Sequence, residues 1–418
     1  MIFLGYEFVW FAIIFFPIYY LALRPKLRLI ALVVSGIVFQ FYYGGWTSVA
    51  PVTVLAIATF LAARAYRPRL MVGTIVLCAT ALALYKYTSF VTTDIIGVAL
   101  PELGATLGRY MQAFLPAMIP LGISFFTFEF VHYLTDLRHG SPPIRRVGEF
   151  LAFALFWPTM VSGPIKRYQQ FVPALHSGLA SPSATDAMIG LIRVAIGFAK
   201  KWAADNLTGW IEYMEPQYAG QSVGWRWIFL TALAFRILLD FSGYSDMAIG
   251  FARMMGIVVP ENFNWPYIAR TPIEFWQRWH ISLSLWIRDY IYIPLGGNRF
   301  GVPRRITNAL TAMALCGLWH GPSWNFVVWG LYHGLGLTIA TFLQRLASHL
   351  RPAERMVASS IGAAALKRTA QPVHVRLVLL AVDLLSWAAT MVFVGVGWLL
   401  FFYPIEKAVT MALALFVE

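Results

Sequence analysis

Long apolar stretches recur along this chain of 418 residues, and they limit its possible folds more than any other feature. A membrane-spanning α-helix needs about 20 consecutive residues that are mostly apolar. Charged residues make up 12% of the sequence and the mean hydropathy is +0.66, whereas a soluble domain carries about a quarter charged residues. Because helices satisfy their own backbone hydrogen bonds in lipid, the sequence predicts an all-α, polytopic membrane protein.

The apolar runs indicate ten to twelve spans, with ends uncertain by a few residues. The first run has no basic segment before it and no small-residue cleavage pattern after it, so we expect a retained span rather than a signal peptide. The runs fall near residues 8–23, 27–43, 49–64, 70–85, 112–136, 147–164, 184–203, 225–252, 306–320, 322–344, 374–403 and 405–417.

The net charge of +13 is interpreted as topological. Basic residues gather in apparent connections between the runs, as they do in cytoplasmic loops of membrane proteins. We therefore expect membrane lipid, and no nucleic acid, as a partner. The residues concerned are Arg64, Arg67, Arg69, Arg138, Arg145, Arg146, Lys166, Arg167, Lys200 and Lys201.

Three regions do not have the pattern of a clean span. Residues 86–111 have the composition of a mixed loop, and residues 350–373 that of a polar surface connection. In residues 253–305 polar residues are concentrated. Transporters often show broken helices in two matching halves, so this concentration in one place argues against a transporter or export channel.

Prolines divide the region 253–305, so no single helix can cross the bilayer there. Short helices that lie in the interface, or that enter the membrane and return, are expected instead. Just before this region, Asp240 and Asp246 lie in an apolar run, where a carboxylate needs a partner or water. Trp276, Trp279 and Trp286 fit a belt at the level of the lipid headgroups.

His280 lies in the stretch FWQRWHISLSLWIRDY. On a continuous helix Trp276, His280 and Ser284 share one face, and Glu274, Arg278 and Ile281 share another. The histidine then points with a tryptophan and a serine toward one side. The alternative is an imidazole anchored at the interface by hydrogen bonds, and spacing by itself favours that alternative.

His320 ends a long apolar run, and Gly321 and Pro322 then break the helix. Burial disfavours the charged imidazolium, so a neutral ring is expected that can accept a proton as a general base. The alternative is a histidine bonded to a nearby carbonyl. Ionisable groups inside the membrane are functional by default, which favours the first interpretation.

Other chemistries have weaker signals. No histidine and cysteine cluster has the spacing of metal ligands, so no metal is expected. Cys316 lies one turn before His320, which leaves a Cys–His nucleophile pair as an alternative to a packed cysteine. His333 is interpreted as structural. The segment LGGNRFG is a turn in which Arg299 could hold a phosphate.

Several segments, taken together and in order, resemble the membrane-bound O-acyltransferase family, and specifically its bacterial branch of alginate O-acetylation and teichoic acid D-alanylation proteins. The segments are LALYKYTSF, IPLGISFFTFEFVHYLTDLRHG, PTMVSGPIKRYQQF, LDFSGYSDMAIGFARMMG, ENFNWPYIARTPIEFWQRWHISLSLWIRDYIYIPLGGNR and LCGLWHGPSWNFVVWGLYHG.

The resemblance implies a ring of helices around a thin centre, with a tunnel between the membrane faces. It implies that His320 is the catalytic base and that His280 assists it. An acyl thioester enters from the cytoplasm, and the acyl group leaves on a hydroxyl acceptor at the far side. The donor is a coenzyme A thioester such as acetyl-CoA, or an acyl-phosphopantetheine carrier protein; no tightly bound cofactor is expected.

Candidate binding residues follow from this reaction. A tetrahedral oxyanion needs hydrogen-bond donors, for which Asn325, Trp324 and His280 are candidates. Arginines at the cytoplasmic mouth could hold the phosphates of the donor. These arginines are Arg270, Arg278, Arg288, Arg299, Arg304 and Arg305. The remaining candidate substrate- or donor-binding residues are Ser284, Trp319, Cys316 and Asp246.

The favoured hypothesis is transfer of an acyl group, most simply acetyl, toward hydroxyls of an extracytoplasmic polysaccharide. An SGNH-type acetyltransferase or another exopolysaccharide protein is the expected partner. D-alanyl transfer from a carrier protein is the alternative. The segment YIPLGGNR resembles the alginate type, whereas the length of the chain is nearer that of the teichoic acid type.

We expect one transmembrane domain over 1–418 in the bacterial inner membrane, with N-terminal spans at 1–111, a catalytic core at 112–345 and a C-terminal part at 346–418.

Overall fold

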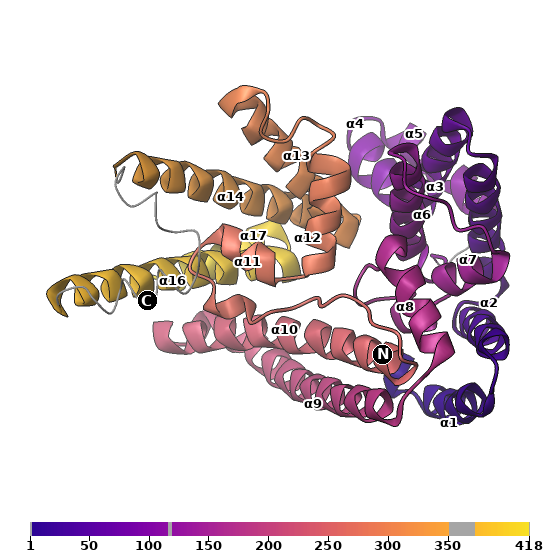
Figure 1. The fold of residues 1–418 in the computed structure, drawn as a ribbon. Coiled ribbons are helices and arrows are strands. Elements are labelled where there is room, and N and C mark those ends of the chain that lie inside the picture. The colour runs from indigo at the N-terminus through magenta and orange to yellow at the C-terminus, as the bar shows by residue number, and fades with distance from the viewer. Residues whose placement is uncertain (1, 116–118, 351–372, 418) are drawn as a thin grey trace. The chain divides into compact units, whose positions relative to one another are not determined.

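A computed structural model describes residues 2–115, 119–350 and 373–417, and most of these residues form α-helices joined by short connections (Figure 1). No β-strand occurs within those ranges, so the all-α prediction is confirmed. Most of the polar segment expected as a surface connection at 350–373 lies outside the described residues.

Five helical segments of the described chain are long and apolar enough to cross a membrane, so the protein is a multi-pass membrane protein. They are Pro25–Ala65, Pro68–Ala99, Val223–Met254, Trp324–Leu346 and Leu377–Phe402. Tyr6–Leu21 and Val147–Thr159 are shorter and apolar. The total of ten to twelve spans stays a prediction, because several apolar runs form helices that are too short or too polar to qualify by length and composition.

The chain divides into two compact units. The first unit contains Met1–Asn206 and Arg236–Asn262, and the second contains Leu207–Phe235 and Phe263–Glu418. Two long helices, α9 (Ala184–Met214) and α10 (Val223–Met254), contribute residues to both units.

The first unit is built mainly from helices that run back and forth between two ends. Its other helices are α1 (Tyr6–Leu21), α2 (Pro25–Ala65), α3 (Pro68–Phe90), α4 (Gly97–Ala99), α5 (Pro101–Phe114), α6 (Ile123–Arg138), α7 (Val147–Ala154) and α8 (Tyr168–Ala180). Helix α2 contains a sharp turn at Gly45, whose φ of 63° favours glycine. Gln40 and Ser48, on either side of that turn, both hydrogen-bond to the backbone of Leu121, so the two halves of α2 share this end.

The interpretation of residues 86–111 as a mixed loop was wrong. This segment continues α3 to Phe90, then forms the π-helical turn Val91–Ile96, and then enters α4 and α5. Helix α5 is amphipathic, and its polar face, with Glu102 and Arg109, lowered the apparent hydrophobicity of the segment without breaking the helix.

Lys166 is the largest departure from the expected pattern of surface cations. It was expected in a cytoplasmic connection, and it does lie between helices, but its side chain is only 1% exposed. Its ammonium lies 2.5 Å from a carboxylate oxygen of Glu129, whose side chain is 2% exposed. The rings of Phe153, Phe156 and Phe171 surround the ammonium at 5.0–5.8 Å. A buried charge needs such a partner, so Lys166 belongs to the interior of the unit.

Lys200 and Lys201 also differ from their prediction, since both lie inside α9 rather than in a connection. Lys201 pairs with Asp240 at 2.6 Å, and Lys200 pairs with Asp246 at 2.5 Å. Arg193 contacts the same carboxylate of Asp246 at 2.7 Å. The expectation that Asp240 and Asp246 require partners in their apolar run is confirmed. Both lysines can lie within the helix because their ammonium groups pair with carboxylates of α10.

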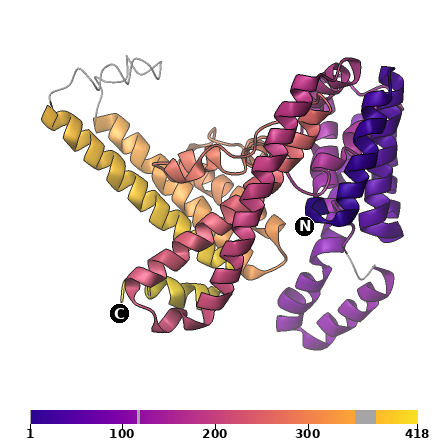
Figure 2. The same ribbon diagram turned by 90° about the horizontal axis from the view of Figure 1, so that it is seen from below.

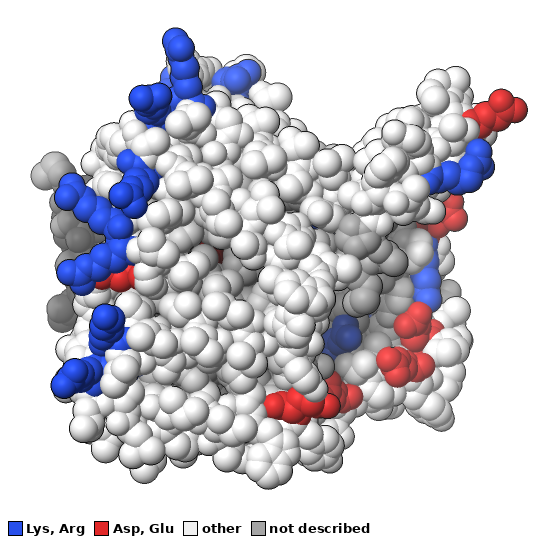
Figure 3. Space-filling model, turned by 90° about the vertical axis from the view of Figure 1, so that its right-hand side faces the viewer, with Lys and Arg blue, Asp and Glu red and all other residues white. Residues whose placement is uncertain are grey.

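A group of cations of the first unit lies in or next to the connections α1–α2, α2–α3 and α6–α7. The hydroxyl of Tyr66, in the second of these connections, donates to the carbonyl of Leu137 near the end of α6. Of the Lys and Arg side chains visible in Figure 3, most lie along one edge, with a wide uncharged surface beside them. An uncharged belt is expected where lipid tails contact the protein, and the positive-inside rule predicts that the basic edge is the cytoplasmic end.

The second unit places short helices among long ones (Figures 1 and 2). The helices are α11 (Pro272–Arg278), α12 (Ile281–Ile287), α13 (Gly301–His320), α14 (Trp324–Leu350), α16 (Val373–Phe402) and α17 (Ile405–Leu413). Helices α13 and α14 pack very closely: a Cβ on Gly317 would lie 2.0 Å from the carbonyl oxygen of Phe326, and one on Gly330 would lie 2.1 Å from that of Met313. Glycine is therefore required at this crossing, which positions the end of α13.

Candidate active site

The expected continuous helix through His280 does not exist. Helix α11 ends at Arg278, and α12 begins at Ile281. The division of residues 253–305 into short helices is confirmed, but the shared face of Trp276, His280 and Ser284 was wrong. Only the pair Glu274 and Arg278, four residues apart within α11, meets as expected, at 2.8 Å.

His280 adopts a left-handed backbone conformation, with φ of 41° and ψ of 54°. This conformation is costly for a residue with a Cβ and persists where the surroundings impose it, often at functional sites. The side chain is 1% exposed. Burial, and secondarily the nearby His320, lower the pKa of His280 well below 6.5. The imidazole is therefore neutral at pH 7.

His320 is the last residue of α13 and is partly exposed. Its ring centroid lies 5.1 Å from that of Phe401 and 5.2 Å from that of Trp329, both nearly perpendicular to it. The neighbouring Trp319 is 4.8 Å away. An aromatic wall of this kind limits water around the imidazole without covering it, as a general base that must meet a substrate requires.

Aromatic rings connect three histidines of this unit. The ring of Trp319 lies 6.1 Å from that of His280 and next to His320. On the other side of His320, the ring of Trp329 lies 4.8 Å from that of His333. His333 is fully buried, and its Nδ1 accepts a hydrogen bond of 3.3 Å from the indole N–H of Trp276. Its interpretation as structural is compatible with this contact.

Trp276, Trp279 and Trp286 do not form the expected headgroup belt. All three are buried, with exposed fractions of 7%, 3% and 6%. The ring of Trp279 packs 4.8 Å from that of Trp398 in α16, which covers it. Tryptophan spacing in the sequence was interpreted as an interface signal, but here the long helices of the unit enclose the short ones.

A pocket of about 320 Å³ lies between α11, α12, α13 and α14. Its size is at the lower end of the range for small-molecule sites. Its lining is partly apolar and partly polar. The apolar lining residues are Ile273, Trp276, Ile287, Ala309, Ala312, Met313, Cys316 and Leu337. Arg288, Tyr292, Asn298 and Arg305, which precede or begin α13, are called the polar end of the pocket, and Ser284, Thr338 and Thr341 also line it.

Arg305 is the most informative polar residue of the pocket. Its exposed fraction is 6%, and no hydrogen bond or ion pair to its guanidinium is present among the described residues. A buried cation without a carboxylate is costly, so the arrangement favours an anionic ligand. Arg299 instead bonds the carbonyls of Gly296 and Ile293 in its own turn and does not line the pocket. Arg288 lines the pocket and pairs with Asp289 at 2.7 Å.

The remaining candidates are divided among different surroundings. Cys316 and Ser284 line the pocket. The amide of Asn325 donates to the carbonyls of Leu400 and Phe401 at 3.4 Å, so it joins α14 to the end of α16 rather than pointing at an open space. Trp324 is 49% exposed at the start of α14. Asp246 belongs to the first unit, where its two cations hold it.

Sequence reasoning named both histidines, whose roles stay predictions, but it did not distinguish Arg305 and did not predict the bond between Trp276 and His333. Arg305 appeared as one of six arginines at the mouth, with nothing to distinguish it. The signal that separates it is burial, and burial of a charged residue beside Arg304 cannot be read from spacing.

Comparisons with known proteins agree with the motifs. Residues 112–367 match the membrane-bound O-acyltransferase family, MBOAT. The chain is 34% identical over 342 residues to the probable alginate O-acetylase AlgI of Pseudomonas aeruginosa, covering 81% of this chain and 58% of that protein. It is 31% identical over 302 residues to the peptidoglycan O-acetyltransferase of Helicobacter pylori, covering 66% and 56%. It is 34% identical over 238 residues to the teichoic acid D-alanyltransferase of Streptococcus thermophilus, covering 52% and 56%.

The chain thus spans a little over half the length of these relatives. The family match nevertheless covers more than half of the chain itself, and it includes both histidines and every wall of the pocket. The protein belongs to the membrane-bound O-acyltransferase family.

Proposed function

We propose that this protein transfers an acyl group, most simply acetyl, from a cytoplasmic thioester to a hydroxyl of an extracytoplasmic polysaccharide. The observation that carries the proposal is the pocket along α13. Arg305 and Cys316 both line it, and they are eleven residues, or about 16 Å, apart on the helix. His320 follows one helical turn later. An elongated donor with an anionic end and an acyl end matches this arrangement.

The polar end of the pocket supports entry of the donor from the cytoplasm. Arg288, Arg299, Arg304 and Arg305 gather before or at the start of α13, and basic residues favour the cytoplasmic side. Arg305, with Arg288, would hold the phosphates of coenzyme A or of a phosphopantetheine arm. The apolar walls beyond them would hold the uncharged part of the donor.

The proposed reaction uses one imidazole for two proton transfers. His320 accepts the proton of the acceptor hydroxyl while its oxygen attacks the thioester carbonyl. The tetrahedral oxyanion then collapses, the carbon–sulfur bond breaks, and the leaving thiolate takes the proton from His320. An ester and a free thiol result, and the histidine returns to its neutral form. His280, positioned by its left-handed backbone and by Trp319, is proposed to assist; Asn325 and Trp324 have weaker support as oxyanion donors.

Related proteins set the range of acceptors. The named relatives act on alginate, peptidoglycan and teichoic acid, so we propose a cell-envelope polymer as acceptor and a further extracytoplasmic transferase as partner. D-alanyl transfer from a carrier protein is the second candidate, which the similarity to the teichoic acid enzyme favours. We also propose that the chain acts as one transmembrane domain of the inner membrane, because the family match includes residues of both units.

The test is an assay of the purified protein in vesicles, supplied with labelled acetyl-CoA or with a D-alanyl carrier protein. Alginate oligomers and a poly(glycerol phosphate) are supplied as acceptors, and label in ester linkage is measured. His320→Ala is expected to lower the rate by about 10²–10⁴-fold, the usual contribution of a general base. Cys316→Ala is the matched control on the same helix and is expected to keep most of the activity.

The outcomes separate the alternatives. Label from acetyl-CoA favours the first function, and label from the carrier favours the second. Full activity of a well-folded His320→Ala protein would remove the catalytic assignment. Loss of activity in Cys316→Ala with a trapped acyl-enzyme would replace it with covalent catalysis.

A further inference from the structure

The first unit contains a pocket of its own, which the proposed reaction does not use. Its volume is about 950 Å³, and it lies between the start of α2, the start of α7 and the end of α8. Arg24, Lys26, Arg146 and His176 line one part of it, together with Glu149. The apolar wall consists of Pro25, Leu29, Ile30, Val33, Val34, Gly148 and Leu179.

The charges of this pocket do not balance. Glu149 is the only carboxylate among its lining residues, and it already bonds Arg146 at 3.3 Å and His176 at 2.9 Å. No hydrogen bond or ion pair to the side chains of Arg24 and Lys26 is present in the described part of the chain. The pocket therefore has an excess of positive charge, which favours an anionic ligand.

The apolar wall indicates that the ligand also has an apolar part. From Arg24 to Val34 the lining extends along ten residues of the chain, about 15 Å if helical. This length equals half of the hydrocarbon core of a bilayer, which is about 30 Å thick. A molecule that fits has a charged end at the membrane surface and an apolar tail that reaches the middle of the bilayer.

The position of the pocket identifies the leaflet. Arg24, Lys26 and Arg146 lie in two of the basic connections that mark the cytoplasmic end of this unit. Basic pockets between helices on that side are a known binding mode for acidic lipid headgroups.

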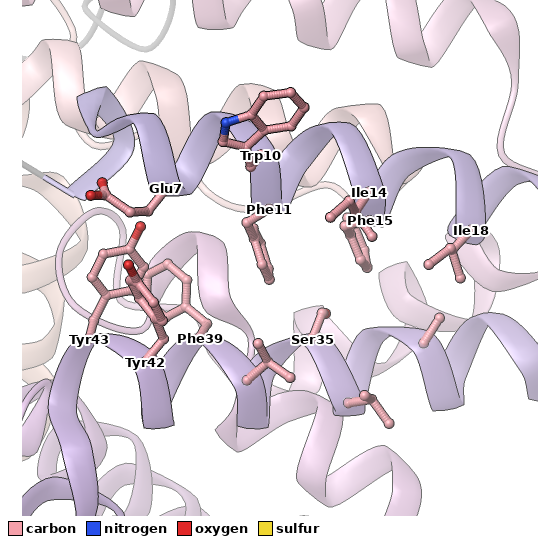
Figure 4. A pocket seen from close by; sticks show the side chains of 13 residues that line it. Glu7, Trp10, Phe11, Ile14, Phe15, Ile18, Ser35, Phe39, Tyr42 and Tyr43 are labelled. Carbon is pink, nitrogen blue, oxygen red and sulfur yellow. The ribbon is translucent and has the colours of Figure 1, made fainter.

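A neighbouring groove on α2 provides a contrast within the same unit. It lies between α1 and α2, has a volume of about 480 Å³, and shares Val34 with the basic pocket. Figure 4 shows its apolar side chains, with Glu7, Tyr42 and Tyr43 at one end. No Lys or Arg lines it, so it has no attraction for an anionic headgroup.

We propose that the basic pocket binds an anionic phospholipid of the cytoplasmic leaflet. The phosphate lies against Arg24, Lys26 and Arg146, and one acyl chain lies along Leu29, Ile30 and Val33. Glu149 holds Arg146 and His176 in place and excludes lipids whose headgroup carries no net negative charge.

The headgroup is tested by native mass spectrometry of the delipidated protein, titrated with phosphatidylglycerol or with phosphatidylcholine of the same chains. The wild type is expected to retain phosphatidylglycerol at least about tenfold more tightly. Arg24→Gln/Lys26→Gln is expected to weaken that binding about 30-fold, which corresponds to about 1 kcal/mol for each removed cation. Arg67→Gln/Arg69→Gln removes two exposed cations from the neighbouring connection and serves as the matched control, with an effect below about threefold.

The acyl chain is tested with two substitutions one heptad apart on α2. Ile30 is 49% exposed and lines the pocket, whereas Ile37 is 47% exposed and lines neither the pocket nor the groove of Figure 4. Ile30→Trp fills the pocket and is expected to weaken phosphatidylglycerol binding about tenfold. Ile37→Trp is expected to leave it unchanged, and neither change should alter acyl transfer.

Three results would overturn the proposal. The first is equal retention of both lipids by the wild type. The second is equal loss of binding in Arg24→Gln/Lys26→Gln and in its control. The third is displacement of the lipid by millimolar glycerol 1-phosphate with no effect of Ile30→Trp, which would assign the site to a soluble phosphate instead.

Discussion

The two units bury polar groups in opposite ways. In the first unit, Lys166 and Glu129 are both almost fully buried, and each neutralises the other. In the second unit, Arg305 is almost as deeply buried, but it lines a pocket without an ion pair among the described residues. The first arrangement is complete within the chain, whereas an anionic ligand, as proposed above, would complete the second.

This difference indicates what each region does. A paired buried charge contributes to a single folded arrangement but leaves nothing with which to bind a substrate. A buried cation without a partner lowers the stability of the free protein, and binding of an anionic ligand offsets that loss. The same type of observation, a charged residue with little exposure, therefore indicates stability in one unit and recognition in the other.

The largest expected effect is on folding of the first unit. Lys166→Met leaves Glu129 buried without its partner and is expected to lower the free energy of unfolding by about 3–5 kcal/mol. Chemical denaturation in detergent measures the change. The double variant Lys166→Met/Glu129→Leu removes both charges and should recover most of the loss. A single variant as stable as the wild type would show that the pair does not carry the stability assigned to it.

The next effect is on donor binding in the second unit. Arg305→Gln is expected to raise the KM for the thioester donor about 10–100-fold, since bonds to charged groups contribute about 1.5–3 kcal/mol. The free energy of unfolding should change little or increase, because an unpaired cation is removed. Arg299→Gln is the matched control, since among the described residues the Arg299 guanidinium hydrogen-bonds only carbonyls of its own turn. Equal effects of the two changes would contradict the assignment of Arg305.

A smaller effect follows from the neutral His280. Its pKa in the folded protein lies well below 6.5, so below about pH 6.5 the unfolded chain binds a proton that the folded chain does not. The contribution of this residue to stability is thus full above pH 6.5 and declines as the pH falls. At pH 5.5 the wild type is expected to lose about 1.4 kcal/mol relative to His280→Asn, which tolerates the left-handed backbone. Unfolding curves of the wild type and of His280→Asn at pH 7.5 and 5.5 measure this difference. If both proteins lose the same free energy of unfolding between these pH values, His280 is protonated in the folded protein at pH 5.5.

The smallest effect concerns the bond between Trp276 and His333. Trp276→Phe keeps the aromatic packing but removes the donor, and it should lower the free energy of unfolding by about 1 kcal/mol. Trp279→Phe, three residues away in the sequence and also buried, is the control, because its indole N–H makes no hydrogen bond to the described part of the chain. If the control loses as much as Trp276→Phe, the effect is one of packing alone.

The sequence by itself determined the class of the protein. Apolar runs of membrane length require helices, and the segment around WHG carries the family resemblance and the choice of His320. Helix ends with strong local causes were also predictable, such as the end of α13 at Gly321 and Pro322. These features depend on local hydrophobicity and on backbone conformation, and both are set by residues that are close in the sequence.

Only the tertiary structure decided where each charge and each ring lies. The same reasoning placed Lys166 at the surface, extended one helix through His280, and favoured Arg299 over Arg305 as a phosphate-binding residue. Lys166 is buried because it pairs with Glu129, which lies 37 residues away in the sequence. His280 is left-handed at the junction where α11 ends and α12 begins. Burial and partners depend on contacts between residues distant in sequence, so the identity of a side chain did not reveal its role.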